Sequence, residues 1–153
     1  MKNFGNAING YRFSRWLYLH KLTFLAKIVR SWIYLIHNCY IPYTAKIGKG
    51  TILGYKGIGV VIHTNAVIGE NCIIGTNVTI GGRGRPNVPV IGDNVYIATG
   101  AKVLGDIHIG NNVVIGANAV MICDAPDYSV WAGVPAKCIK KKDLTNDHAR
   151  KDS

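Results

Sequence analysis

Residues 91–109 read Ile91-Gly92-Asp93-Asn94-Val95-Tyr96-Ile97-Ala98-Thr99-Gly100-Ala101-Lys102-Val103-Leu104-Gly105-Asp106-Ile107-His108-Ile109, with a β-branched apolar residue at every sixth position. A six-residue unit of this kind is a short strand followed by a tight turn, which makes one flat side of a coil. Three units close a triangular coil, and stacked coils bury the apolar residue of each unit. The segment therefore predicts a β-solenoid.

The same period extends in both directions from this segment. The residue after each apolar position is mostly Gly or Ala, because a bulkier side chain would clash at the turn. We expect the solenoid to occupy residues 41–124, after a helical cap (1–40) and before a C-terminal turn and basic tail (125–153). The inward positions are Ile41, Ile47, Leu53, Ile62, Ile68, Ile74, Ile80, Ile91, Ile97, Val103, Ile109, Ile115 and Met121.

Two insertions interrupt the period. The step from Leu53 to Ile62 is nine residues, and the step from Ile80 to Ile91 is eleven. The second insertion, within residues 81–90, is rich in Gly and carries Arg83 and Arg85. Insertions in repeat proteins usually lie on a functional face, so we expect this loop to bulge from the solenoid beside a binding site.

The first 40 residues have the period of a helix instead. A short helix is predicted around Tyr11–Leu19. A second helix follows, with Asn38 and Pro42 closing the region. One face of this second helix holds Leu25, Ile28, Val29, Trp32, Ile33 and Ile36.

Composition and charge narrow the function classes. The 153 residues are 48% hydrophobic, which excludes global disorder, and the formal net charge is +10. No acidic residue precedes Glu70, and such basic regions favour anionic partners such as phosphates or acidic lipids.

The four cysteines lack the short spacing of a zinc or redox site, and residues 1–30 lack a signal-peptide pattern. We expect reduced thiols and a cytoplasmic location.

Four segments carry a family resemblance over roughly residues 41–140: Val78-Thr79-Ile80-Gly81-Gly82, Ile91-Gly92-Asp93-Asn94-Val95, Gly100-Ala101-Lys102-Val103-Leu104-Gly105-Asp106 and Ala132-Gly133-Val134-Pro135-Ala136-Lys137. Together with the six-residue repeat, these segments resemble hexapeptide-repeat acyltransferases of the serine-acetyltransferase-like branch. The resemblance implies a left-handed parallel β-helix and acetyl-CoA as the donor. It also implies a homotrimer with active sites between neighbouring subunits.

The acceptor expected from the resemblance is a sugar. Serine acetyltransferases carry an Asp-His pair where this chain reads Leu53-Gly54-Tyr55-Lys56-Gly57, with no Asp or His. They also carry an Arg-His-Pro where it reads Pro86-Asn87-Val88-Pro89, again without His. Short, basic chains of this kind resemble enzymes of bacterial capsule, exopolysaccharide or lipopolysaccharide clusters. We therefore expect transfer to a hydroxyl of a nucleotide-linked or lipid-linked sugar in surface polysaccharide synthesis, with N-acetylation open for an aminosugar. Serine O-acetylation is the alternative.

Transfer to a hydroxyl needs a base, and a histidine is the usual choice. His63 follows an inward residue where the repeat elsewhere favours Gly or Ala, and it lies one coil below the inserted loop. His63 is the expected general base in a direct transfer, with a backbone N–H near Gly81-Gly82 stabilising the oxyanion. We interpret His20, His37 and His148 as surface or packing residues, and His108 as ordinary repeat context.

The remaining site residues are expected to bind the two substrates. Gly82, Ala98 and Ala117 leave room for a pantetheine arm. Candidate phosphate contacts are Arg83, Arg85, Lys102 and Lys137. Tyr55, Lys56 and Asn77 are candidates to orient the acceptor.

Two other classes of protein fit the sequence less well. A zinc-binding β-helix would need three histidines, and only His63 and His108 lie in the repeats, so no metal is expected. A bare scaffold would leave the arginine-bearing loop and the Ala132–Lys137 segment unexplained. No nucleic-acid partner is expected. The aromatic and basic N-terminal helices suit either capping of the solenoid or peripheral contact with the anionic inner membrane.

Overall fold

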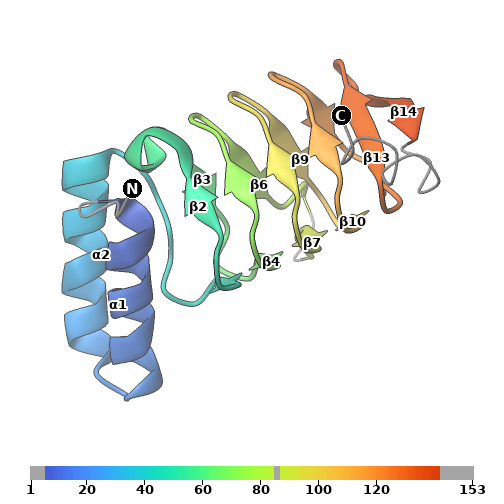
Figure 1. Cartoon of the computed structure of the whole chain (residues 1–153). Coiled ribbons are helices and arrows are strands. Elements are labelled where there is room, and N and C mark those ends of the chain that lie inside the picture. Colours follow the sequence, from blue (N-terminus) through green and yellow to red (C-terminus); the bar gives the residue numbers. More distant parts are fainter. Residues whose placement is uncertain (1–5, 85–86, 142–153) are drawn as a thin grey trace, which may run out of the picture.

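The computed structural model of the chain describes residues 6–84 and 87–141. Two antiparallel helices, α1 (Ala7–Leu19) and α2 (Thr23–His37), cross one end of a stack of coils (Figure 1). We call this pair the helical hairpin. The predicted β-solenoid with an N-terminal helical region is confirmed. Among the described residues, no helix is long and apolar enough to cross a membrane.

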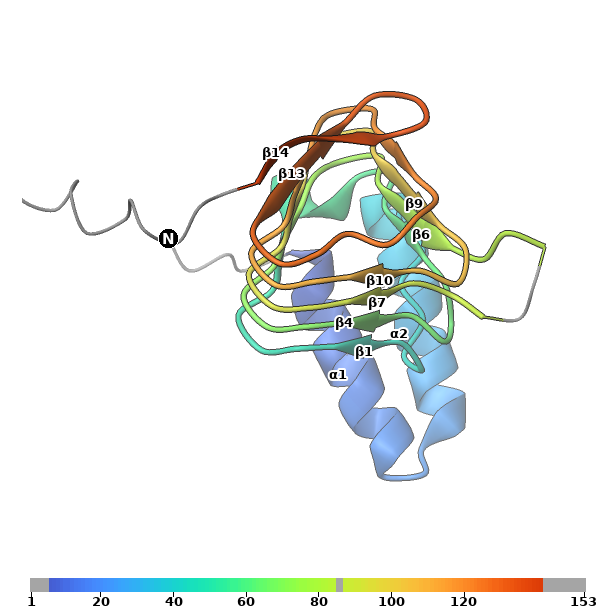
Figure 2. The same ribbon diagram turned by 90° about the vertical axis from the view of Figure 1, so that its right-hand side faces the viewer.

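Each of the first four coils contributes one short strand to each of three sheets, and successive coils pair in parallel (Figure 2). The last two strands of the chain both extend the second sheet. The first sheet has the order β1-β4-β7-β10, the second β14-β13-β11-β8-β5-β2, and the third β12-β9-β6-β3. The strands are β1 (Lys46–Ile47), β2 (Ile52–Leu53), β3 (Val61–Ile62), β4 (Val67–Ile68), β5 (Ile73–Ile74), β6 (Thr79–Gly81), β7 (Val90–Ile91), β8 (Tyr96–Ile97), β9 (Lys102–Leu104), β10 (His108–Ile109), β11 (Val114–Ile115), β12 (Val120–Met121), β13 (Ser129–Ala132) and β14 (Lys137–Lys141); the 3₁₀ turn η1 (Gly54–Gly57) joins β2 to β3.

The predicted burial of the inward residues of the six-residue repeat is confirmed at almost every position. Side chains from Leu53 to Met121 at these positions are buried, and only Ile47, in the first coil, is partly exposed. Coil corners also require left-handed backbone, which asparagine and glycine adopt at the least cost. Asn77 and Asn118 have φ of 56° and 55°, and each side chain fills the space beside a glycine of the preceding coil (Gly59 and Gly100).

The helical hairpin closes the first coil with both apolar and polar contacts. Ile8, Tyr11 and Ile33 join the core of the solenoid. The Tyr11 hydroxyl donates to Ala45 O (2.7 Å) and accepts from the Ile47 N–H (3.2 Å). Arg15 Nη1 donates to Ala45 O (2.8 Å), and Asn6 Nδ2 donates to Leu53 O (3.0 Å). These side chains satisfy backbone groups of the first coil that have no preceding coil to pair with.

The predicted apolar face of the second helix is only partly buried. Ile33 is 5% exposed and Val29 packs against the core, but Trp32 is 59% and Ile36 is 67% exposed. The side of α2 that contacts α1 is instead centred on Ala26 and Ile33. The helical period correctly groups residues on a face, but it does not show whether another element covers that face.

Candidate active site

The described candidate residues of the solenoid lie at two corners, one on each side of the third sheet. The loop corner joins the third sheet to the first and includes, among the described residues, 63–66, 82–84, 87–89 and 105–107. The lysine corner joins the second sheet to the third and includes residues 54–60, 75–78, 98–101 and 116–119. Strands of the third sheet separate the two corners within one chain.

The inserted loop leaves the coil outline at the loop corner (Figure 2). It lies between the coil of His63 and the coil of Gly105–Asp106. His63 N–H donates to Ile80 O (2.9 Å), directly before the loop, and Asn87 Nδ2 donates to Asp106 Oδ2 (2.8 Å) behind it. The position of His63 one coil below the loop is therefore as expected from the spacing. Gly82 and Arg83 are exposed there.

The small-residue argument for His63 does not apply at this corner. The equivalent positions in later coils are Gly81, Leu104 and Ile122, so large side chains are common there. A Cβ added to Gly81 would meet nothing within 4 Å, whereas one added to Gly69, at another corner, would collide with the backbone of Gly92. An imidazole at position 63 is therefore accommodated without strain, and what sets His63 apart is its place beside the loop.

The His63 ring is half-buried, and its Nδ1 accepts the Asn65 N–H at 3.2 Å. A neutral imidazole that accepts at Nδ1 carries its proton at Nε2. In this arrangement Nε2 is a donor. Before Nε2 can accept a proton from a hydroxyl, the ring must release Asn65 and move its own proton to Nδ1.

The first insertion forms an unusual turn at the lysine corner. Tyr55 (φ 46°, ψ 44°) and Lys56 (φ 64°, ψ 9°) are consecutive left-handed residues, and neither is Gly or Asn. Such conformations cost about 1–3 kcal/mol each and are concentrated at functional sites. Tyr55 is 83% exposed, so its ring gains little from packing in the chain itself.

Other candidates extend along the lysine corner from coil to coil. Lys102 Nζ donates to Asn77 O (2.7 Å), which holds that ammonium group at the corner. Ala98 is buried and Ala117 is exposed in the next coil. Lys137 begins β14 and follows the turn at Gly133–Ala136. The backbone of this turn hydrogen-bonds to Val120, in the same coil as Ala117.

His37, which the sequence analysis interprets as a surface or packing residue, lies close to the lysine corner. It ends α2 beside the lysine corner, where the Asn38 carbonyl accepts the Gly59 N–H (2.9 Å). Burial lowers the pKa of His37, and the nearby charge of Lys56 lowers it further. This imidazole therefore stays neutral at physiological pH. The sequence held no signal for it, because residues 37 and 56 meet only through the packing of the helical hairpin on the solenoid.

Within one chain, the candidate residues form two groups and not one site. His63, Gly82 and Arg83 share the loop corner. Arg85 lies outside the described residues. The lysine corner holds the acceptor candidates Tyr55, Lys56 and Asn77 together with Ala98 and Ala117, and Lys102 at the start of β9 and Lys137 at the start of β14 lie next to it.

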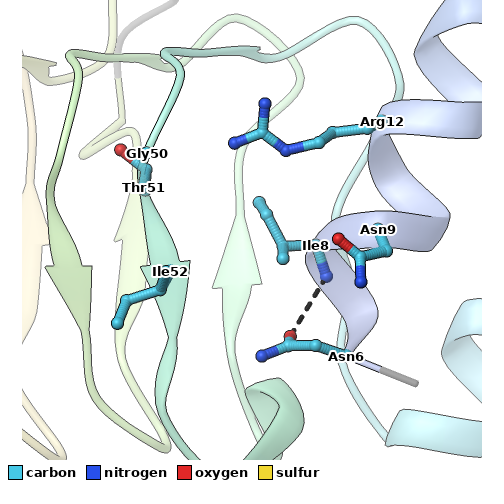
Figure 3. A pocket seen from close by; sticks show the side chains of 7 residues that line it. All are labelled: Asn6, Ile8, Asn9, Arg12, Gly50, Thr51 and Ile52. Atoms are coloured by element: carbon cyan, nitrogen blue, oxygen red, sulfur yellow. Dashed lines mark hydrogen bonds between the residues drawn. The ribbon is translucent and has the colours of Figure 1, made fainter. Parts of the chain in front are cut away.

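A hollow of about 230 Å³ lies elsewhere, between α1 and the first coil (Figure 3). Arg12 extends from α1 toward Gly50, and Asn6 caps the helix by accepting the Ile8 N–H (3.2 Å). None of the predicted site residues lines it. Its lining residues are Asn6, Ile8, Asn9, Arg12, Gly50, Thr51 and Ile52.

Metal ligands and the two buried thiols do not mark a further centre in the part of the chain that the structure describes. No group of three or more His, Cys, Asp or Glu residues there is placed to hold a metal ion. Burial raises the pKa of Cys39 to about 11, and burial also raises the pKa of Cys72. Both thiols therefore stay protonated near neutral pH.

Comparisons with known proteins identify relatives along almost the whole chain. Residues 89–123 match the family model "Bacterial transferase hexapeptide (six repeats)". A serine acetyltransferase of Helicobacter pylori is 37% identical over 139 residues, covering 89% of this chain and 81% of the relative. One from Synechococcus elongatus is 34% identical over 144 residues, covering 92% of this chain and 59% of the relative.

A solved structure agrees with these relatives. The Brucella abortus serine acetyltransferase in complex with coenzyme A superposes with a TM-score of 0.84 at 33% identity. The match covers 90% of this chain and 56% of that one. The chain thus spans little more than half the length of this protein and of the Synechococcus relative.

These relatives correct the expected acceptor. The prediction of a sugar hydroxyl in surface polysaccharide synthesis is wrong, because the matched proteins are serine acetyltransferases. They support the alternative, serine. The absent Asp-His and Arg-His-Pro motifs misled the interpretation because they describe two short segments, whereas the matches extend over most of the chain.

Proposed function

This chain belongs to the serine acetyltransferase family, and from that membership we propose that it transfers the acetyl group of acetyl-CoA to the hydroxyl of serine. The observation that carries the proposal is the match to the Helicobacter enzyme, which covers most of both chains. The reaction forms an ester bond at the serine oxygen and breaks the thioester bond. The coenzyme leaves as a thiol after gaining the proton that the hydroxyl loses.

We propose that His63 carries this proton. Its place beside the inserted loop supports the assignment, because backbone N–H groups near Gly82 would stabilise the negative charge on the thioester oxygen. The Nδ1 contact with Asn65 must be released when the ring accepts the hydroxyl proton. The imidazolium then returns the proton to the departing sulfur.

Cationic side chains at both corners suit the phosphates of acetyl-CoA. Arg83 and Lys137 are exposed, and Lys102 is anchored through Asn77 O. We assign these three side chains, together with Arg85, to phosphate contacts. Ala98, Ala117 and Gly82 would leave space for the pantetheine arm. Tyr55, Lys56 and Asn77 would orient serine.

We propose that the active unit is a homotrimer. One chain keeps the loop corner and the lysine corner on opposite sides of the third sheet, so neither corner holds all of the assigned residues. A neighbouring subunit that sets its lysine corner against the loop corner would complete the site. We place this trimer in the cytoplasm, in peripheral contact with the inner membrane. Sedimentation velocity of the full chain should show a trimer and no monomer at assay concentrations.

The deciding experiment measures thiol release from acetyl-CoA by the full chain, with and without serine. Serine-dependent release is expected, with a loss of about 100-fold or more in kcat for His63→Gln. His37→Gln is the matched control, because it changes an imidazole at the other corner. No serine-dependent release by the unmodified chain overturns the proposed function. Loss of activity in His37→Gln, with His63→Gln unaffected, would move the proton carrier to the lysine corner.

A further inference from the structure

The outer side of α2 is an apolar face that nothing in the chain covers. Its six large side chains are 40–75% exposed, although they follow one another at helical spacing along this fifteen-residue helix. The opposite side of α2, centred on Ala26 and Ile33, makes the contacts with α1. We call the exposed side the α2 face; its residues are Phe24, Leu25, Ile28, Trp32, Leu35 and Ile36.

The position of the helical hairpin leaves this face accessible. Both views show the helices at the end of the stack opposite β13 and β14, with the 19–23 turn extending beyond the outline of the coils (Figures 1 and 2). Leu19 and Leu22 in that turn are 63% and 43% exposed. The apolar surface therefore continues from α2 to the tip of the hairpin.

Charge restricts what can cover the α2 face. The first acidic residue of the chain is Glu70, so every charged side chain of the hairpin is basic. Lys21 and Lys27 are exposed beside the face. Two copies that met through this face would bring the same cations together, with no carboxylate of either hairpin to offset them. An anionic surface with an apolar interior would satisfy both the cations and the exposed side chains.

A hollow of about 370 Å³ lies at the edge of the face. Its lining combines Arg30, Ser31 and Tyr34 with Leu35 and Tyr40. The Arg30 guanidinium lies over the Tyr40 ring, 5.7 Å from its centroid, which fixes a positive charge at the rim. Aromatic and basic groups beside an apolar face are typical of helices that lie in a membrane surface.

We propose that the α2 face docks on a bilayer of anionic phospholipid, with α2 lying in the plane of the interface. Trp32, Leu35 and Ile36 enter the acyl boundary, while Lys21, Lys27 and Arg30 contact lipid phosphates. This inference deepens the proposed peripheral location by naming the surface and the lipid class. It rests on that location and is independent of acetyl transfer.

Vesicle co-sedimentation of the full chain tests the proposal. The wild type should bind vesicles of phosphatidylcholine mixed with phosphatidylglycerol, should bind phosphatidylcholine alone far more weakly, and should be released by high salt. Trp32→Ser combined with Leu35→Ser should lower the partition coefficient about ten-fold or more. Both side chains are exposed, so the variant should keep its fold, which circular dichroism verifies.

Two matched variants separate the contributions. Lys21→Gln with Lys27→Gln should weaken binding to anionic vesicles only. Ile139→Ser removes an equally exposed apolar side chain at the far end of the chain and should leave binding unchanged. Wild type that stays in solution with anionic vesicles overturns the proposal, as does binding that Trp32→Ser with Leu35→Ser leaves intact. Lipid-free self-association that the same double variant abolishes would assign the face to a second copy instead. None of these readouts depends on enzyme activity.

Discussion

The solenoid and the helical hairpin are both rich in branched apolar residues, but they use them in opposite ways. In the solenoid, Ile97 and its equivalents point inward and are fully buried. In the hairpin, Ile36 and the other residues of the α2 face point outward and are 40–75% exposed. The same side chain therefore contributes to stability in one region and is available for binding in the other.

The largest expected effect tests this contrast directly. Ile97→Ala should lower the free energy of unfolding by about 2–5 kcal/mol, because it removes buried methyl groups and leaves a cavity. Ile36→Ala should change it by less than about 0.5 kcal/mol. Urea denaturation at one fixed protein concentration measures both. Equal losses would mean that the α2 face is buried in solution.

A second pair of variants tests why the coils need glycine. Gly69→Ala should cost about 1–3 kcal/mol, because the new methyl group collides with the Gly92 backbone of the next coil. Gly81→Ala should be close to neutral, since nothing lies within 4 Å of its added Cβ. Thermal unfolding of the two proteins compares them. Similar costs would show that the loop corner packs more tightly than its geometry indicates.

A smaller effect is expected where the two regions are joined by hydrogen bonds. Tyr11→Phe removes the donor to Ala45 O and the acceptor for the Ile47 N–H, which should cost about 1–2 kcal/mol. Tyr34→Phe, on the exposed side of α2, is the control and should cost almost nothing. If Tyr11→Phe has wild-type stability in urea, water replaces the hydroxyl and the joint between hairpin and solenoid rests on apolar packing.

The smallest expected effect is a change in the pKa of His37, which depends on the contact between the two regions. His37, from the hairpin, should titrate below its ordinary pKa of 6.5, and Lys56→Met should raise its pKa by removing the solenoid's positive charge. Because folding favours the neutral ring, the associated stability is present above pH 6.5 and is lost as pH falls through the lowered pKa. NMR titration of the histidine ring protons measures the shift. If the His37 pKa is unchanged in Lys56→Met, the charge of Lys56 does not act on the His37 ring.

The same comparison shows what could be predicted from the sequence. The solenoid was predictable because its period is local: Ile80 and Ile91 identify both the inward positions and the loop between them. The uncovered side of α2 was not, since helical spacing groups Trp32 with Ile36 but says nothing about neighbouring elements. Of the candidate site, the spacing correctly placed His63 below the loop. It could not bring His37 to Lys56, which depends on how the hairpin packs.

The way the chain closes its two ends also governs its behaviour in concentrated solution. A stack of parallel strands is a template for further strands, and an uncovered end would recruit other molecules into fibres. Tyr11, Arg15 and Asn6 occupy the backbone groups at the first coil, and the antiparallel β14 carries lysines 137, 140 and 141 at the last. The length of the solenoid is thereby fixed at both ends. A chain shortened to begin at residue 46 should consequently pair with a second copy through its uncovered first coil, while β14 still blocks growth at the other end.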